Sequence, residues 1–171
     1  MIKYVKGNLF AHIDQPCVIP HVTNDIGAWG AGFVLAINKY LGMSPRGSFL
    51  NASKNLLYDL GDVDYCRTLK YKVRATVGGP IAEAQTAVTV ANMCSQHGVG
   101  FGSTGDLRVD KPIRYAALVS CMKDVARYAD EFPQPILCPR FGSALAGGNW
   151  EFIDQLIHEI WGCFNVTVFE H

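Results

Sequence analysis

The segment 95–100, SQHGVG, contains His97, the only side chain there whose unperturbed pKa lies near neutrality. A histidine in such a segment can protonate a leaving group or activate a water molecule. A structural or substrate-orienting role is equally open, because only geometry can assign a base. Cys94 is three residues away, but it continues an apolar strand, and Cys–His nucleophile pairs are spatial rather than sequential neighbours. No metal site is predicted, because this pair lacks further ligands.

Two glycine-rich loops share one pattern, in which an apolar strand runs into the loop and a helix follows. They are VIPHVTNDIGAWGAG (18–32) and PILCPRFGSALAGGNW (135–150). Glycine lets backbone amides approach a diphosphate closely, and a helix N-terminus adds a favourable dipole. Tight turns alone also explain such glycines, and neither loop has the G-x-G-x-x-G fingerprint or the Lys-Ser/Thr of a P-loop. Together, the two loops predict the two sides of one phosphate-binding cradle.

Apolar periodicity predicts the elements that position these loops. Strands are predicted over 2–5, 17–23, 134–142 and 165–170, and residues 62–92 predict two or three more with a hairpin among them. Helices are predicted over 30–41, 46–61, 113–129 and 150–161, with Pro112 in the first turn of the third and Asn149 capping the last. The glycine-rich segment 98–112 predicts a loop. This alternation predicts an α/β fold with helices on both faces of a sheet.

The composition of the chain excludes several classes of protein. Its 171 residues suit one domain, and 15 Lys and Arg balance 15 Asp and Glu, so general nucleic-acid binding is not expected. Because the sequence shows no signal peptide or membrane-spanning run, we expect a soluble cytoplasmic protein. The 6 cysteines include no C-x-x-C pair, which predicts mostly buried thiols rather than a disulfide framework or a zinc site.

Four segments carry a family resemblance: YVKGN (4–8), HVTNDIGAWGAG (21–32), NMCSQHGVG (92–100) and PRFGSALAGGNWE (139–151). Together they resemble a macro domain, the ADP-ribose-binding fold, and the resemblance spans nearly the whole chain. It implies a single domain over 1–171 with three α/β/α layers and a mixed central sheet. The most similar branch is that of ADP-ribose 1″-phosphate processing proteins, which includes the terminal ADP-ribose protein glycohydrolase type. The implied partner is ADP-ribose or a derivative, including an ADP-ribosylated macromolecule, without a cofactor or metal.

The resemblance also assigns roles to single residues. Asn8 occupies a position near the adenine where Asp is commoner, so the adenine contact is either weaker or made by neighbouring backbone such as that of Leu9. A simple turn role explains Asn8 almost as well. Asn24 is placed at the hydroxyls of the distal ribose, although loop asparagines usually support turns. Asp25 is the candidate carboxylate partner of His97, so Asn24, Asp25 and His97 form the predicted catalytic group.

The two glycine loops supply the remaining predicted contacts to ADP-ribose. These are Gly30, Ala31, Gly32 and Phe33 in the first loop, and Gly142, Ser143, Ala144, Leu145, Ala146 and Gly147 in the second. The chain departs from the terminal glycohydrolase type, because Ala146 replaces its aspartate and the segment 92–95 lacks its lysine. A lysine adduct with the ribose is therefore not predicted.

The implied activity is hydrolysis at the distal ribose. It is either dephosphorylation of ADP-ribose 1″-phosphate or removal of ADP-ribose from a modified macromolecule. A reader module that binds ADP-ribose without turnover is the main alternative, and a Rossmann-type NAD enzyme is a third.

Overall fold

The computed structural model describes residues 1–55, 58–100 and 111–170, and its strands form a six-stranded sheet with the order β1-β6-β5-β2-β4-β3. The strands are β1 (Ile2–Lys6), β2 (Cys17–Asn24), β3 (Val63–Thr76), β4 (Gly79–Gln96), β5 (Ile136–Pro139) and β6 (Val166–Glu170). Neighbouring strands are parallel except for the antiparallel pair β3 and β4. The sheet is therefore mixed, as predicted.

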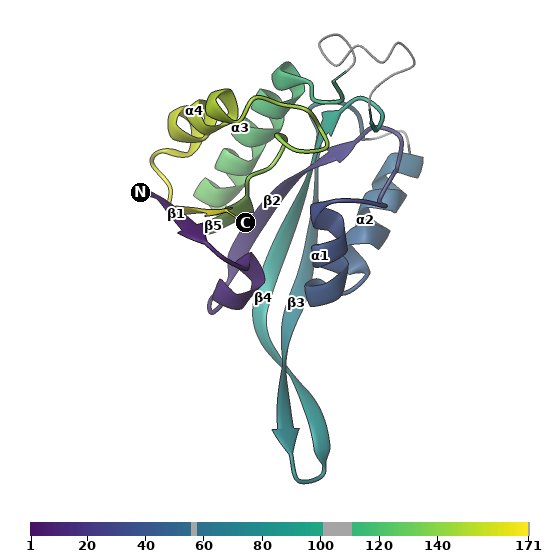
Figure 1. Cartoon of the computed structure of the whole chain (residues 1–171), viewed down its shortest axis with the longest axis vertical. Helices are drawn as coiled ribbons and strands as arrows, with labels where there is room; N and C mark the ends of the chain where they lie inside the picture. Colours follow the sequence, from purple (N-terminus) through teal and green to yellow (C-terminus); the bar gives the residue numbers. More distant parts are fainter. Residues whose placement is uncertain (56–57, 101–110, 171) are drawn as a thin grey trace.

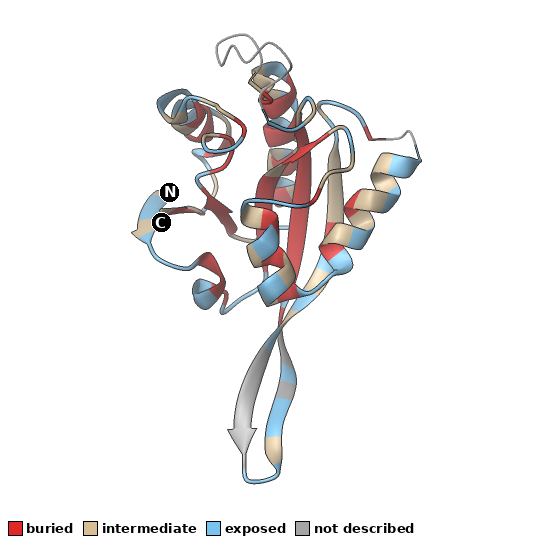
Figure 2. Ribbon diagram, turned by 45° about the vertical axis from the view of Figure 1, so that its right-hand side comes forward, coloured by how far each residue is buried: buried red, intermediate tan, exposed pale blue. Residues whose placement is uncertain are grey.

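Helices cover both faces of this sheet (Figure 1). They are the 3-10 helix η1 (Leu9–His12) and the α-helices α1 (Phe33–Leu41), α2 (Ser44–Lys54), α3 (Tyr115–Glu131) and α4 (Trp150–Trp161). Side chains alternate along β2, so that Cys17 and Ile19 pack with α1 and α2 while Val18 packs with α3 and α4. The central strands are buried on both faces (Figure 2), which confirms the three-layer α/β/α arrangement.

Several predicted boundaries shift in the structure. Helix α1 begins at Phe33 rather than at residue 30, because Gly32 precedes it with a φ of 80°. Helix α2 ends at Lys54, well before Gly61, whose amide donates to the Cys94 carbonyl 2.8 Å away. Residues 56–57 lie outside the described residues, as do residues 101–110 of the predicted loop 98–112. Strand β5 is shorter than the predicted 134–142.

The two caps predicted from sequence have different outcomes. The Asn149 side chain accepts a hydrogen bond from the Phe152 amide, which confirms it as the N-cap of α4. Pro112 lies outside α3, which begins at Tyr115, so the prediction that it starts the helix is wrong. Its carbonyl instead accepts a hydrogen bond of 2.8 Å from the His97 amide, which fixes the chain after β4.

Strands β3 and β4 confirm the hairpin predicted within 62–92. Only from Val88 onward does β4 also pair with β2, so the preceding part of β4 pairs with β3 alone. This two-stranded extension projects away from the rest of the molecule (Figure 1). The extension therefore lies away from the glycine loops.

Strand β6 lies between β1 and β5, so β1 is joined to the sheet only through β6. The pairing runs from Ile2 opposite Val166 to Lys6 opposite Glu170, and the Gly7 amide extends it to the Glu170 carbonyl. This attachment holds η1, which follows Gly7 and Asn8, beside the end of β6.

The cysteines are free thiols, and those buried are Cys17, Cys66, Cys94, Cys121 and Cys138. Burial raises the pKa of the Cys17 and Cys94 thiols to about 12, which makes both poor nucleophiles. Within residues 1–55, 58–100 and 111–170, no group of three or more His, Cys, Asp or Glu side chains is placed to hold a metal ion. None of the described helices is long and apolar enough to cross a membrane.

Candidate functional site

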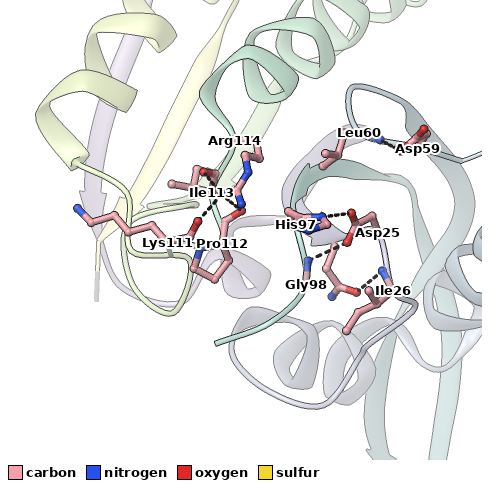
Figure 3. A network of polar contacts seen from close by, with 11 residues as sticks. Asp25, Ile26, Asp59, Leu60, His97, Gly98, Lys111, Pro112, Ile113 and Arg114 are labelled. Carbon is pink, nitrogen blue, oxygen red and sulfur yellow. Dashed lines mark hydrogen bonds and ion pairs between the residues drawn. The ribbon is translucent and has the colours of Figure 1, made fainter. Parts of the chain in front are cut away.

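The carboxyl ends of β2 and β4 bring two of the predicted catalytic residues into contact. These strands are parallel neighbours that finish at Asn24 and Gln96, so Asp25 and His97 emerge at the same edge of the sheet. His97 Nδ1 lies 2.6 Å from Asp25 Oδ2, and the Gly98 amide donates to Asp25 Oδ1 at 2.8 Å (Figure 3). The predicted partnership between Asp25 and His97 is thus present in the geometry.

This geometry fixes the tautomer of His97. Burial acts to raise the pKa of Asp25, but hydrogen bonds from the Gly98 amide and from His97 outweigh it, so this pKa is lowered. An ionised carboxylate can only accept, so Nδ1 of His97 carries the proton. In the neutral ring Nε2 then presents a lone pair, and 64% of the His97 side chain is exposed. The pair can therefore accept a proton from a water molecule or a ligand.

The lowered pKa of Asp25 predicts a pH dependence of stability. A carboxyl group whose pKa is lower in the folded state stabilises the fold above its unfolded pKa of about 3.9 and loses that contribution as pH falls through the folded pKa. We expect Asp25→Asn to lower the free energy of unfolding at neutral pH, and we expect this difference to shrink progressively as pH falls below about 4 toward the folded pKa. Urea unfolding of Asp25→Asn and wild type at several pH values measures it, and a difference that grows on acidification contradicts the assignment.

The Asn24 side chain is 6% exposed and is used within its own loop. Its Oδ1 accepts from the Ala28 amide at 2.8 Å and from the Ile26 amide at 3.3 Å, and its Nδ2 donates to the Ala28 carbonyl at 2.7 Å. These bonds shape the start of the first glycine loop. The ribose contact predicted for Asn24 stays a prediction, while the turn-supporting role is visible in the structure.

Asn24→Ala is expected to weaken ADP-ribose binding by at least about tenfold, because the amides of residues 26 and 28 lose the acceptor that shapes the first glycine loop. Asn24→Asp keeps that acceptor but replaces the donor to the Ala28 carbonyl with a charged oxygen. It is the control for the acceptor alone, and it should bind more tightly than the Ala variant if the hydrogen bonds from residues 26 and 28 decide affinity. Calorimetric titration with ADP-ribose compares them. Unchanged affinity in Asn24→Ala would refute the ribose contact and show that binding does not depend on the loop shape that Asn24 supports.

The first loop ends at the N-terminus of α1. Gly32 has a φ of 80°, which disfavours any other residue, and the first amides of the helix that follows have no intrahelical partner. Gly30 has open space around it, so that a Cβ at this position would meet no other atom within 4 Å. Residues 30–32 are exposed, so the backbone of this loop is open to solvent.

The second loop is held in shape by its own backbone. The Gly148 amide donates to the Gly142 carbonyl at 2.8 Å, and the Gly147 amide donates to the Ala144 carbonyl at 2.9 Å. Ala146 is 3% exposed, and its carbonyl accepts from the Ile113 amide, so this residue anchors the loop to the core. Ser143 is half-buried, with its hydroxyl 3.5 Å from the Arg140 carbonyl.

The two loops meet at Gly32 and Leu145. A Cβ on Gly32 would lie 3.4 Å from Leu145 Cδ1, although Leu145 is 62% exposed. An exposed leucine that faces a bare stretch of backbone can cover a ligand lying between the loops. The predicted opposition of the loops is therefore present, while their contacts to a diphosphate stay predictions.

A pocket of about 510 Å³ begins at Gly32 and extends to the turn after β1. Its lining includes four predicted ligand residues: Asn8, Leu9, Gly32 and Phe33. Gly30, Ala31 and the predicted residues of the second loop do not line it. Sequence reasoning missed the pocket residues Phe10, Lys39, Tyr40 and Phe169. For Lys39 and Tyr40 the available signal is helical spacing, because they lie about two turns after Phe33 on α1.

The fold and the site define an α/β protein with a nucleotide-sized pocket beside paired glycine loops. The chain is 35% identical to a protein of unknown function from Bacteroides thetaiotaomicron, with 100% of this chain and 98% of that chain covered and a TM-score of 0.79. It is 30% identical to a macrodomain protein from Streptomyces coelicolor, with 100% and 99% covered and a TM-score of 0.70. The chain belongs to the macro domain family.

The fold also matches the Thermosipho africanus DarTG protein in complex with ADP-ribose, at 14% identity and a TM-score of 0.68. This match covers 98% of the present chain and 41% of that chain. No protein-family model matches the chain, and no curated protein matches it significantly.

Proposed function

We propose that this macro domain binds ADP-ribose and hydrolyses a bond at its distal ribose. The bond is either the phosphate ester of ADP-ribose 1″-phosphate or the link between ADP-ribose and a modified macromolecule. The observation that carries the proposal is the hydrogen-bonded pair of Asp25 and His97 at the carboxyl ends of two neighbouring strands. Ligands of open α/β sheets bind at this edge.

In this proposal the pocket and the first glycine loop together set the orientation of the ligand. The adenosine occupies the pocket that Asn8 and Phe33 line, and the diphosphate lies near Gly32, at the N-terminus of α1. The first loop leads from there to Asp25, so the distal ribose points toward the Asp25–His97 pair. Binding energy from the adenosine and diphosphate holds the distal ribose in place for reaction.

His97 supplies the proton transfer in the proposed reaction. Its Nε2 takes a proton from water as the water oxygen attacks the phosphorus or the C1″ carbon, and the bond to the leaving oxygen or nitrogen breaks. The proton then passes to the leaving group, while Asp25 stabilises the imidazolium that forms in between. This chemistry needs no lysine adduct, which agrees with Asn92–Ser95 lacking a lysine.

A reader module that binds ADP-ribose without turnover is the second candidate, and two observations favour it. Position 146 carries a buried alanine where the glycohydrolase type has an aspartate, and the Asn24 side chain is engaged within its own loop. Both reduce the number of polar side chains free to act on the distal ribose.

One set of assays separates the two candidates. The protein is incubated with ADP-ribose 1″-phosphate and with mono-ADP-ribosylated protein, and ADP-ribose binding is measured by calorimetry. We expect binding together with product from one of the substrates. Binding without product from either contradicts the hydrolase and leaves the reader, whereas absence of binding contradicts both.

A further inference from the structure

The Asn8 side chain is held in one orientation at the end of the pocket. Its Oδ1 accepts from the Phe10 amide at 3.1 Å, and its Nδ2 donates to Tyr40 Oη at 3.0 Å. A backbone amide can only donate, so the atom that faces Phe10 must be the oxygen. The nitrogen therefore faces Tyr40, and its second N–H is left for another acceptor.

This orientation makes the end of the pocket rich in donors. Because Tyr40 Oη accepts from Asn8, its own proton is free to point elsewhere. Lys39 is exposed, lines the same pocket and is its only charged lining side chain among the described residues. Asn8 keeps one further lone pair on Oδ1. The polar groups there thus offer N–H and O–H donors together with two acceptors, the remaining lone pairs of Asn8 Oδ1 and Tyr40 Oη.

The remaining walls suit a flat aromatic ring. Phe10 and Tyr40 are stacked with centroids 4.7 Å apart, and Phe10 and Phe33 are stacked at 5.6 Å. Gly32 lies at the other end of the pocket, where the α1 N-terminus favours phosphate. A nucleotide whose phosphates lie at Gly32 therefore presents the edge of its base to Asn8 and Tyr40.

We propose that Asn8 makes this pocket accept 6-oxopurines about as well as adenine, so that hypoxanthine counterparts of ADP-ribose are also ligands. The inference rests on the proposed function and concerns the base alone. Adenine offers an amine donor and a ring-nitrogen acceptor, whereas hypoxanthine offers a ring N–H donor and a carbonyl acceptor. In its fixed orientation the Asn8 amide keeps one N–H, which can donate to the hypoxanthine carbonyl, and one Oδ1 lone pair, which can accept from the adenine amine. Either base can therefore form one hydrogen bond with Asn8 without rotation of the amide.

An aspartate at position 8 would select between the two bases. Its carboxylate only accepts, so it can pair with the adenine amine but repels the 6-oxo group. The carboxylate would also accept a hydrogen bond from the Tyr40 hydroxyl, which would then no longer donate to the base. The helix η1 is retained, because one carboxylate oxygen still caps the Phe10 amide. Asn8→Asp is therefore a test of specificity that leaves the fold intact.

The experiment is calorimetric titration of wild type and Asn8→Asp with ADP-ribose and with inosine diphosphate ribose. We expect wild-type Kd values within about threefold of each other, and a preference for ADP-ribose of about tenfold or more in Asn8→Asp. Tyr40→Phe, which keeps the stacked ring and removes one donor, should weaken the hypoxanthine ligand more than the adenine ligand.

Two results would overturn the inference. One is a wild-type preference for ADP-ribose of about tenfold or more, and the other is an Asn8→Asp preference within about threefold of wild type. In either case ADP-ribose still binds, so the proposed function survives. Failure of both nucleotides to bind wild type would overturn the inference and the proposed function together.

Discussion

His97→Ala is expected to lower the rate of hydrolysis by about 100- to 10,000-fold, the usual contribution of a general acid or base. ADP-ribose should still bind with a Kd within about threefold of wild type, because the exposed imidazole lies outside the base pocket. The substitution removes the Nε2 lone pair and leaves Asp25 with its hydrogen bond from the Gly98 amide. Single-turnover rates and calorimetry measure the two effects separately.

A matched control for His97→Ala is His158→Ala on α4. The His158 ring lies 2.9 Å from the hydroxyl of Tyr4 on a different part of the surface, so its loss should leave turnover unchanged. If His97→Ala retains full turnover while ADP-ribose binds, hydrolysis depends on an oriented water molecule and not on this histidine.

Gly148→Ala is expected to destabilise the protein by about 2–3 kcal/mol and to lower Tm by roughly 4–12 °C. A Cβ at this position would lie 2.4 Å from the Gly142 carbonyl oxygen and 3.0 Å from Ile153 Cδ1. The backbone of the second loop must therefore move, which breaks the hydrogen bond from the Gly148 amide to Gly142. Because this loop forms one side of the proposed cradle, ADP-ribose affinity should fall with it.

Gly30→Ala is the matched control in the opposite loop. A Cβ there meets nothing within 4 Å, and Gly30 does not have a positive φ. The Tm of Gly30→Ala should therefore stay within about 2 °C of that of wild type. Thermal unfolding with and without ADP-ribose compares the two variants. Equal Tm values for Gly148→Ala and Gly30→Ala would show that the backbone of the second loop can move to accommodate the Cβ without a loss of stability.

The sequence predicts the layers of this fold well because its signals there are local. The apolar run along 17–23 and the helical stripe over 150–161 each require only neighbouring residues, and Asn149 as a cap requires only the helix that follows it. Boundaries are less accurate where a distant contact decides them. Gly61, for example, lies outside α2 because its amide pairs with Cys94 on β4.

In the candidate site, too, features with local signals could be predicted from the sequence, and features that depend on distant contacts could not. Asp25 and His97 could be paired from the family resemblance, because both follow strands that end at one edge of the sheet. Helical spacing from Phe33 is the only sequence signal for Tyr40 and Lys39, and it does not reveal the pocket itself, which forms when η1 packs against α1. The engagement of Asn24 with residues 26 and 28 likewise depends on the shape of the loop that it stabilises.

The position of β6 between β1 and β5 has a consequence for the order of folding. Strand β1 has no partner until Val166–Glu170 is in place, whereas β2 and β4 can pair without either end of the chain. We therefore expect a refolding intermediate in which Asp25 already contacts His97 while Asn8 and Phe10 are still detached. Nucleotide affinity would then be acquired last, in the same kinetic phase as the docking of the final strand.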